Sequence, residues 1–186
     1  LQCYGGSGYV TDYPIEQFIR DQKIDTLYEG TTHIQALDLV FRKIARDGGQ
    51  TLRGLMERVQ GTLGTIDPAG PLGVEHAALS RALVDLQGIY QALLGKLGES
   101  VYHVGLQGNR VLFATAEVVI GWLLVRQATV AVVARQTAHA SEHDFYDGKL
   151  AAVRFYARNV LPGVTLTRKL VEQTTLELME LPESAF

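Results

Sequence analysis

Apolar residues recur at helical spacing along most of this 186-residue chain, and they predict an all-α protein. In three long stretches the apolar positions step alternately by three and four residues, which is the a/d spacing of packed helices. These seams run over residues 79–97, 111–132 and 150–181, and a shorter helix is predicted over 51–63. Because such faces need a partner to exclude water, we predict an antiparallel bundle of about four helices.

Glycines and prolines mark the breaks between the predicted helices. Gly48 and Gly49 follow the end of a helical pattern, and residues 64–73 hold two prolines and three glycines, which predicts a loop. Pro162 and Gly163 interrupt the last seam without shifting its register. We therefore predict a kinked or broken helix there, with no reversal of the chain, and continuation of the seam as far as Leu181.

The N-terminal block carries the strongest candidate for chemistry, the carboxylate of Glu29. A helix is predicted from about residue 13, with Pro14 in its first turn and an apolar stripe on one face. The next helix is predicted to begin at Thr32, which forms a capping-box pattern with Gln35, and to run to about residue 44. Glu29 lies on the short connection between them, with Gly30 behind it leaving room for a close approach to the backbone. This is how a general base would be placed.

Composition excludes several classes of function. The net charge is −3 with both signs dispersed, so no nucleic acid or anionic membrane surface is expected as a partner. The single cysteine, Cys3, rules out an internal disulfide framework, is expected to be a bystander thiol, and fits a cytoplasmic protein. The most apolar stretch, 118–134, contains Arg126 and Gln127, so we interpret it as a packed helix and not as a membrane span.

Three motifs at consistent spacing give the N-terminal block a family resemblance. They are Gln2-x-x-Gly5-Gly6-x-Gly8-Tyr9, Arg20-Asp21-x-Lys23-Ile24 and Tyr28-Glu29-Gly30-Thr31-x-x-Ile34-Gln35. Together they resemble the flavin-binding end of the C-terminal helical domain of acyl-CoA dehydrogenases. Two positions depart from the commoner pattern, since Gln17 stands where an arginine is frequent and His33 where a small or acidic residue is usual.

The resemblance implies an FAD-dependent oxidoreductase of fatty acid β-oxidation that acts on an acyl-CoA thioester. It implies that Glu29 is the catalytic base and that Gly30 contacts the substrate. It further implies a homo-oligomer, dimer or tetramer, with a flavin site shared between subunits, and electron-transferring flavoprotein as the electron acceptor. The residues expected to contact FAD are Gln2, Gly5, Gly6, Thr31, Thr32 and His33.

The resemblance also divides the chain. Residues 1–47 are expected to be the end of the dehydrogenase helical domain, and residues 48–186 a helical-bundle extension like that of the 3-methylmercaptopropionyl-CoA dehydrogenase-like subgroup. Because Leu1 is not a start methionine, we expect a C-terminal fragment of a longer polypeptide, inactive alone. The alternative function is a helical dimerisation module without activity, and the intact Glu-Gly-Thr sequence at Glu29 favours the enzyme.

Two further side-chain groups have simpler interpretations. His139, Glu142, His143 and Asp144 have spacing that a metal site could use, but they fall where a loop is predicted, so we interpret them as a solvated turn and expect no metal. Glu16 and Arg20, four residues apart, are expected to form an ion pair that stabilises the helix before Glu29.

Overall fold

The computed structural model describes residues 1–185, and every regular element in this range is a helix, which confirms the all-α prediction. The short 3₁₀ and π segments (η) join seven α-helices. The helices are α1 (Ile15–Lys23), α2 (Thr32–Asp38), α3 (Gln50–Leu63), α4 (Gly73–Gly95), α5 (Tyr102–Thr137), α6 (His143–Asn159) and α7 (Pro162–Glu172).

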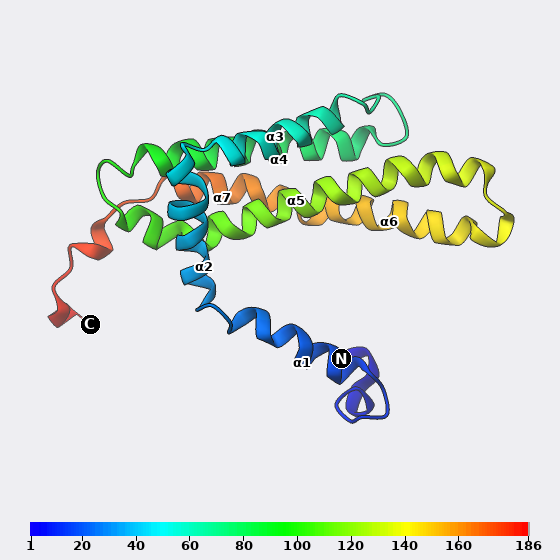
Figure 1. The fold of residues 1–186 in the computed structure, drawn as a ribbon, viewed down its shortest axis with the longest axis horizontal. Helices are drawn as coiled ribbons and strands as arrows, with labels where there is room; N and C mark the ends of the chain where they lie inside the picture. Colours follow the sequence, from blue (N-terminus) through cyan, green and yellow to red (C-terminus); the bar gives the residue numbers. More distant parts are fainter. Residues whose placement is uncertain (186) are drawn as a thin grey trace.

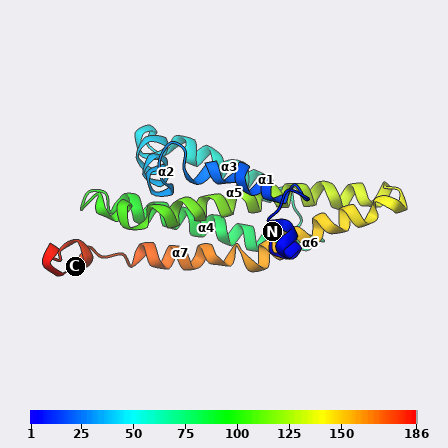
Figure 2. The same cartoon turned by 90° about the horizontal axis from the view of Figure 1, so that it is seen from below.

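Helices α3 to α7 form the predicted antiparallel bundle (Figure 1). The 36-residue α5 runs its full length, and α6 returns beside it from the far end. Helix α7 then continues in the direction of α6 and packs against α4, as both views show (Figure 2). The break between α6 and α7 has Pro162 at the first position of α7, as predicted, and the chain does not reverse there.

The last predicted seam is wrong beyond Glu172, where α7 ends. The predicted seam members Leu178 and Leu181 lie outside any α-helix and are mostly exposed. The ammonium group of Lys96, just after α4, donates hydrogen bonds to the carbonyl oxygens of Glu172 and Thr174, both at 2.9 Å. A cation that satisfies the free carbonyls at a helix C-terminus stabilises the end of the helix at that point.

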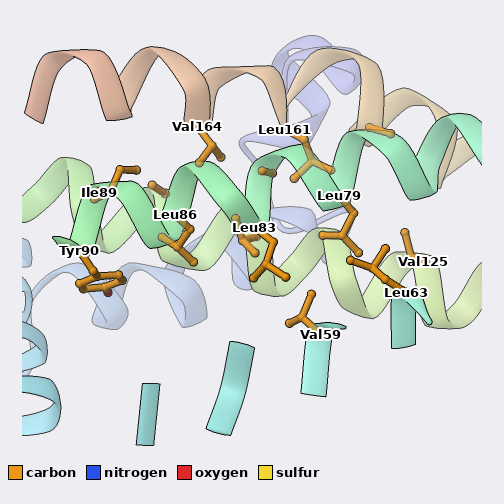
Figure 3. Packing of buried hydrophobic residues seen from close by; sticks show 14 of the residues in the cluster. Val59, Leu63, Leu79, Leu83, Leu86, Ile89, Tyr90, Val125, Leu161 and Val164 are labelled. Carbon is orange, nitrogen blue, oxygen red and sulfur yellow. The ribbon is translucent and has the colours of Figure 1, made fainter. Parts of the chain in front are cut away.

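The hydrophobic core lies between the bundle helices (Figure 3). Leu83, Leu86 and Ile89 of α4 are at most 2% exposed and pack in one cluster with Val59 of α3 and Val164 of α7. The cluster also includes residues from the segment before α3, described next. Interdigitated aliphatic side chains of this kind supply most of the stability of a helical bundle.

Helix α2 anchors the N-terminal block to the bundle. Ala36 is fully buried against α5, where a Cβ placed on Gly108 would lie 3.4 Å from the Ala36 Cβ. The π-helical segment η3 (Leu39–Ile44) then buries Val40 and Ile44 in the same core. The core therefore extends across the predicted domain boundary at residues 47 and 48, which itself stays a prediction.

The segment before α2 is an arm that leads away from the bundle (Figure 1). It consists of η1 (Gln2–Gly8), α1 and η2 (Ile24–Thr26), and α1 buries none of its residues. The predicted apolar stripe is present, but Phe18 is 58% exposed and Ile19 44% exposed. The predicted ion pair also forms, with Arg20 Nε 2.8 Å from Glu16 Oε2.

Helix α5 is, among residues 1–185, the one helix long and apolar enough to cross a membrane by length and composition alone. Its inner face packs against α2, α4, α6 and α7. Only 28% of its most apolar 18-residue window is buried inside the structure, so much of its apolar surface faces outward.

Candidate functional site

Glu29 occupies a strained backbone position. It lies between η2 and α2 with φ = 57°, and it is the one residue other than glycine with positive φ in the described range 1–185. The left-handed region costs an L-residue other than asparagine or aspartate about 1–2 kcal/mol, and such strain persists where surrounding contacts impose it. The predicted general base is therefore held in an uncommon backbone geometry.

Two neighbouring contacts impose that geometry. The side-chain amide of Gln35 donates a hydrogen bond of 2.8 Å from Nε2 to the carbonyl oxygen of Glu29. Gly30 follows with φ = 104°, and a Cβ there would lie 3.0 Å from Cβ of Ile34. Only glycine fits this position without strain, so the turn fixes the direction in which the Glu29 backbone faces.

The N-cap of α2 is Thr31, and the prediction that Thr32 caps this helix is wrong. Thr31 has extended backbone angles, and its hydroxyl oxygen accepts a hydrogen bond of 3.3 Å from the Ile34 N–H. Thr32 already has helical geometry and is half-buried, as is His33. With the cap one residue earlier, Gln35 falls at the fourth helical position, and its amide reaches back to Glu29 and not to the cap.

The Glu29 side chain is exposed and has positive charge within electrostatic reach. On the following helical segment, Arg42 forms a bidentate ion pair with Asp38. The hydrogen bond to Asp38 is the main reason that the pKa of the Arg42 guanidinium lies above its usual value, and the charge of Glu29 contributes in the same direction. Arg42 is therefore a cation that interacts with Glu29, although its ion pair with Asp38 offsets most of its charge.

The glycines of the predicted cofactor loop at the N-terminus differ in the space around them. Gly5 has φ = 56°, and a Cβ built on Gly5 or Gly6 would meet nothing within 4 Å. A Cβ on Gly8 would instead lie 2.9 Å from the Leu1 carbonyl oxygen and from Tyr4 Cβ, so Gly8 serves the packing of the loop itself. Gly5 and Gly6, beside the exposed Gln2, leave the backbone open to approach by another molecule.

The chain does not bring the two predicted FAD-contacting segments together. The loop around Gly5 lies at one end of α1, and the turn around Thr31 lies at the other (Figure 1). Residues 15–26 between them form α1 and η2, which corresponds to roughly 18 Å at 1.5 Å per residue. A single chain can therefore contact a dinucleotide with both segments only at well-separated points, or can contribute them to different sites.

The cluster at residues 139–144, whose spacing a metal site could use, forms a helix cap. The imidazole Nδ1 of His139 accepts a hydrogen bond from the Ser141 N–H at 3.3 Å, and Glu142 Oε2 accepts one from the His139 N–H at 3.2 Å. Among residues 1–185, no group of three histidine, cysteine, aspartate or glutamate side chains is arranged to hold a metal ion. Ser141 and Glu142 thus account for His139 without a ligand.

Sequence reasoning missed a buried charged cluster between α4 and α7. Asp85 is 5% exposed, accepts a hydrogen bond from the Thr165 hydroxyl, and pairs with Arg168, whose Nη1 lies 3.3 Å from Asp85 Oδ1. These residues are about 80 positions apart, so no local spacing could have indicated the pair. The cluster links α4 to α7, and Thr165 also borders a surface groove of about 320 Å³ with Arg81 and Pro162.

The sequence of this all-helical chain matches two family models. Residues 1–44 match the model described as acyl-CoA dehydrogenase, C-terminal domain, and residues 55–182 match the model described as acetyl-CoA dehydrogenase C-terminal like. The chain therefore belongs to the acyl-CoA dehydrogenase family, and the resemblance inferred from its motifs is confirmed.

Individual relatives extend over the whole chain. It is 48% identical to the broad-specificity linear acyl-CoA dehydrogenase FadE5 of Mycobacterium tuberculosis, over 100% of this chain and 32% of that protein. It is 32% identical to a butyryl-CoA dehydrogenase of Syntrophomonas wolfei, over 100% of this chain and 31% of the relative. It is also 32% identical to the 3-methylmercaptopropionyl-CoA dehydrogenase of Ruegeria pomeroyi, over 87% of this chain and 27% of the relative. The chain spans about a third of the length of these relatives.

Proposed function

We propose that this chain supplies the catalytic base and part of the FAD site of an enzyme that dehydrogenates acyl-CoA thioesters between the α- and β-carbons. The observation that carries the proposal is the backbone of Glu29, held at φ = 57° by Gln35 and Gly30 in a chain of this family. A surface glutamate with no role would gain stability by relaxing to an ordinary conformation.

In this mechanism Glu29 removes the α-proton of the thioester, and the carboxylate becomes a carboxylic acid. A bound FAD would supply the acceptor for the hydride that leaves the β-carbon as the carbon–carbon double bond forms. The backbone N–H of Glu29 donates a hydrogen bond to the thioester oxygen, where negative charge develops as the proton leaves. Gly30, without a side chain, allows the thioester to lie against this backbone.

The chain's residues suit an FAD molecule in two respects. Gly5 and Gly6 leave open backbone to which a phosphate or ribose oxygen could bind closely. Thr31, Thr32 and His33 form the first turn of α2, where free N–H groups favour a negatively charged or hydrogen-bond-accepting group. Because these two segments lie at opposite ends of α1, we propose that they serve FAD molecules shared between subunits of a homo-oligomer. Electron-transferring flavoprotein is the proposed acceptor.

The experiment that tests the base is Glu29→Gln in the full-length polypeptide. Glutamine keeps the size of the side chain and the strained backbone but removes the basicity. We expect FAD to stay bound and flavin bleaching by an acyl-CoA substrate to fall to less than a few per cent of the wild-type rate. Glu16→Gln, which alters a partly buried glutamate on the same arm, is the matched control and should bleach normally. Rapid bleaching by the Glu29 variant would assign the base to another residue.

The proposed cofactor loop is tested by Gly6→Val. A Cβ at this position would meet nothing within 4 Å in the chain, so the fold should tolerate the side chain while approach of the cofactor should not. We expect a loss of FAD content with unchanged helical circular dichroism. Gly98→Val, in a turn with equal free space, is the control and should retain its flavin. Full flavin content in the Gly6 variant would make this loop an ordinary turn.

A further inference from the structure

Gln35 holds the chain on both sides of Gly30. Its backbone N–H donates a hydrogen bond of 3.1 Å to the carbonyl oxygen of Thr31, the N-cap residue of α2. Its side-chain amide donates a second hydrogen bond, 2.8 Å long, to the carbonyl oxygen of Glu29. One residue of α2 therefore ties down the turn that carries the proposed base.

The hydrogen bond from the Gln35 side chain fixes the peptide group between Glu29 and Gly30. The preceding turn ends where the Tyr28 N–H donates to the Ile24 carbonyl oxygen, and in the described range no other hydrogen bond involves Glu29 or Gly30. Because a peptide group is planar, holding its oxygen restricts the backbone angles of the residues on either side. Glycine at residue 30 permits this conformation but does not select it, since glycine populates many backbone angles.

The bundle in turn fixes the position of Gln35. The next residue, Ala36, is fully buried and faces Gly108 of α5. Gln35 itself is half-buried, so its backbone cannot shift without moving Ala36 out of the core. The amide of Gln35 is thus presented from a rigid helix, and the exposed turn at Glu29 is held against it.

Stability alone does not account for this contact. The hydrogen bond is exposed, so a water molecule could replace the amide as donor with little change in the free energy of unfolding. Water has no fixed position, however, and would not hold Glu29 at its strained φ of 57°. The contact therefore matters more for the geometry of Glu29 than for the stability of the fold.

The φ angle of Glu29 relates the two groups that the proposed reaction uses. The carboxylate takes the α-proton, and the backbone N–H donates to the thioester oxygen. Since φ is the rotation about the bond between N and Cα, it sets the angle between the N–H and the side chain. A Glu29 that relaxed to negative φ would no longer direct both groups at the substrate as this conformation does.

We propose that Gln35 is a positioning residue for proton abstraction. Its amide holds the Glu29 backbone at positive φ, so that the carboxylate and the N–H keep the relative direction that the reaction requires. The inference rests on the proposed function of Glu29 and adds a residue that acts through Glu29 and not on the substrate.

The test is Gln35→Met in the full-length polypeptide, because methionine keeps the length and helix propensity of glutamine and removes the donor. Relaxation from positive φ is favoured by a factor of about 5–30, so the fraction of competent Glu29 should fall by about that factor. The reporter is a 3-thiaacyl-CoA in D₂O, whose sulfur in place of the β-carbon prevents hydride loss. Deuterium uptake at its α-carbon, measured by mass spectrometry, then reports proton abstraction alone.

We expect Gln35→Met to exchange about 5–30-fold more slowly at saturating ligand, with its affinity for the ligand changed less than about twofold and its FAD content unchanged. Gln35→Lys, which restores a donor on a flexible side chain, should recover most of the rate. Gln22→Met, at an exposed glutamine of α1, is the matched control and should exchange like the wild type. Circular dichroism checks the fold, and Gln35→Ala repeats the test if methionine disturbs the packing.

Three results would overturn the positioning role of Gln35: a wild-type exchange rate in Gln35→Met, an equal loss in Gln35→Lys, or a loss confined to ligand affinity. Glu29→Gln is measured in parallel to separate this inference from the proposed function. Normal exchange by Glu29→Gln would refute the base itself. Loss of exchange in Glu29→Gln without loss in Gln35→Met would refute the positioning role alone.

Discussion

Replacing Gly88 with alanine should separate a packing effect from a helix-propensity effect at the contact between α4 and α7. A Cβ at residue 88 would lie 2.5 Å from Arg168 Nε and 2.6 Å from Arg168 Cζ, so the arginine must leave its position. That position is the one from which Nη1 donates a hydrogen bond to the carboxylate of Asp85. Gly88→Ala therefore removes a charged partner from a carboxylate that is 5% exposed.

The expected magnitude follows from three contributions. Losing a hydrogen bond between charged groups costs about 1.5–3 kcal/mol, which we reduce to about 1–2 because the Arg168 side chain is 35% exposed and screened by water. Asp85 keeps the Thr165 hydroxyl as a donor, which limits the loss. Crowding against Arg168 adds about 1 kcal/mol, and alanine in a helix interior returns about 0.8–1. We expect Gly88→Ala to destabilise the protein by about 1–2 kcal/mol.

The assay is urea unfolding followed by circular dichroism, with Gly148→Ala in α6 as the matched control. Gly148 lies in a helix interior with nothing within 4 Å of a built Cβ, so alanine there should stabilise the protein by up to about 1 kcal/mol. In an Arg168→Met background, Gly88→Ala should lose most of its cost, because a flexible uncharged side chain can move aside. The reasoning is refuted if Gly88→Ala is as stabilising as Gly148→Ala.

Four smaller predictions concern the bundle. Leu86→Ala should lower the unfolding free energy by about 2–5 kcal/mol in urea, since Leu86 is 1% exposed and its removal leaves a cavity. His143→Ala should change it by less than about 0.5 kcal/mol, and a larger loss would indicate an undetected role for the 139–144 turn. Tyr90→Phe should lower the unfolding free energy by about 1 kcal/mol, because the 2.7 Å hydrogen bond to the Thr115 hydroxyl is lost. In the wild type, burial should raise the pKa of the Tyr90 phenol to about 12 in a spectroscopic titration. The hydrogen bonds from Arg135 hold the pKa of Asp147 below its usual 3.8. The difference in unfolding free energy between the wild type and Asp147→Asn should therefore be fully present above pH 3.8 and should disappear as the pH falls through the lower native pKa. A difference that is unchanged in acid would contradict the ion pair.

Much of the helical architecture could be predicted from the sequence, because a/d seams specify both helices and their need for partners. The helix at 51–63, the loop around Pro68 and the unreversed break at Pro162 agree with the structure. The end of the last seam could not be predicted, since Leu178 and Leu181 keep helical spacing although Lys96, from another helix, favours an end near Glu172. The spacing of apolar residues predicts which residues can share one face of a helix, but contacts with residues distant in sequence determine where α7 ends.

The candidate site shows the same division. Motif spacing located Glu29 between two helices and identified the open glycine positions near the N-terminus. It placed the cap of α2 one residue late, because Thr31 and Thr32 are chemically equivalent as caps and only the backbone angles distinguish them. The positive φ of Glu29 was also beyond prediction, since it depends on the amide of Gln35, whose partner was expected to be the cap.

The burial of Ala36 against Gly108 makes the bundle a mechanical support for the turn that carries Glu29. Helix α2 is short, and Val40 and Ile44 just after it are buried in the core, so the position of the turn at Glu29 depends on how this segment packs against the bundle. Truncation after Gly48 would therefore remove the surface on which α2 packs, leave the side chains of Ala36, Val40 and Ile44 without partners and release the arm. In this way the bundle would help to position the proposed base, and substitution of Gly108 is the place to alter that position.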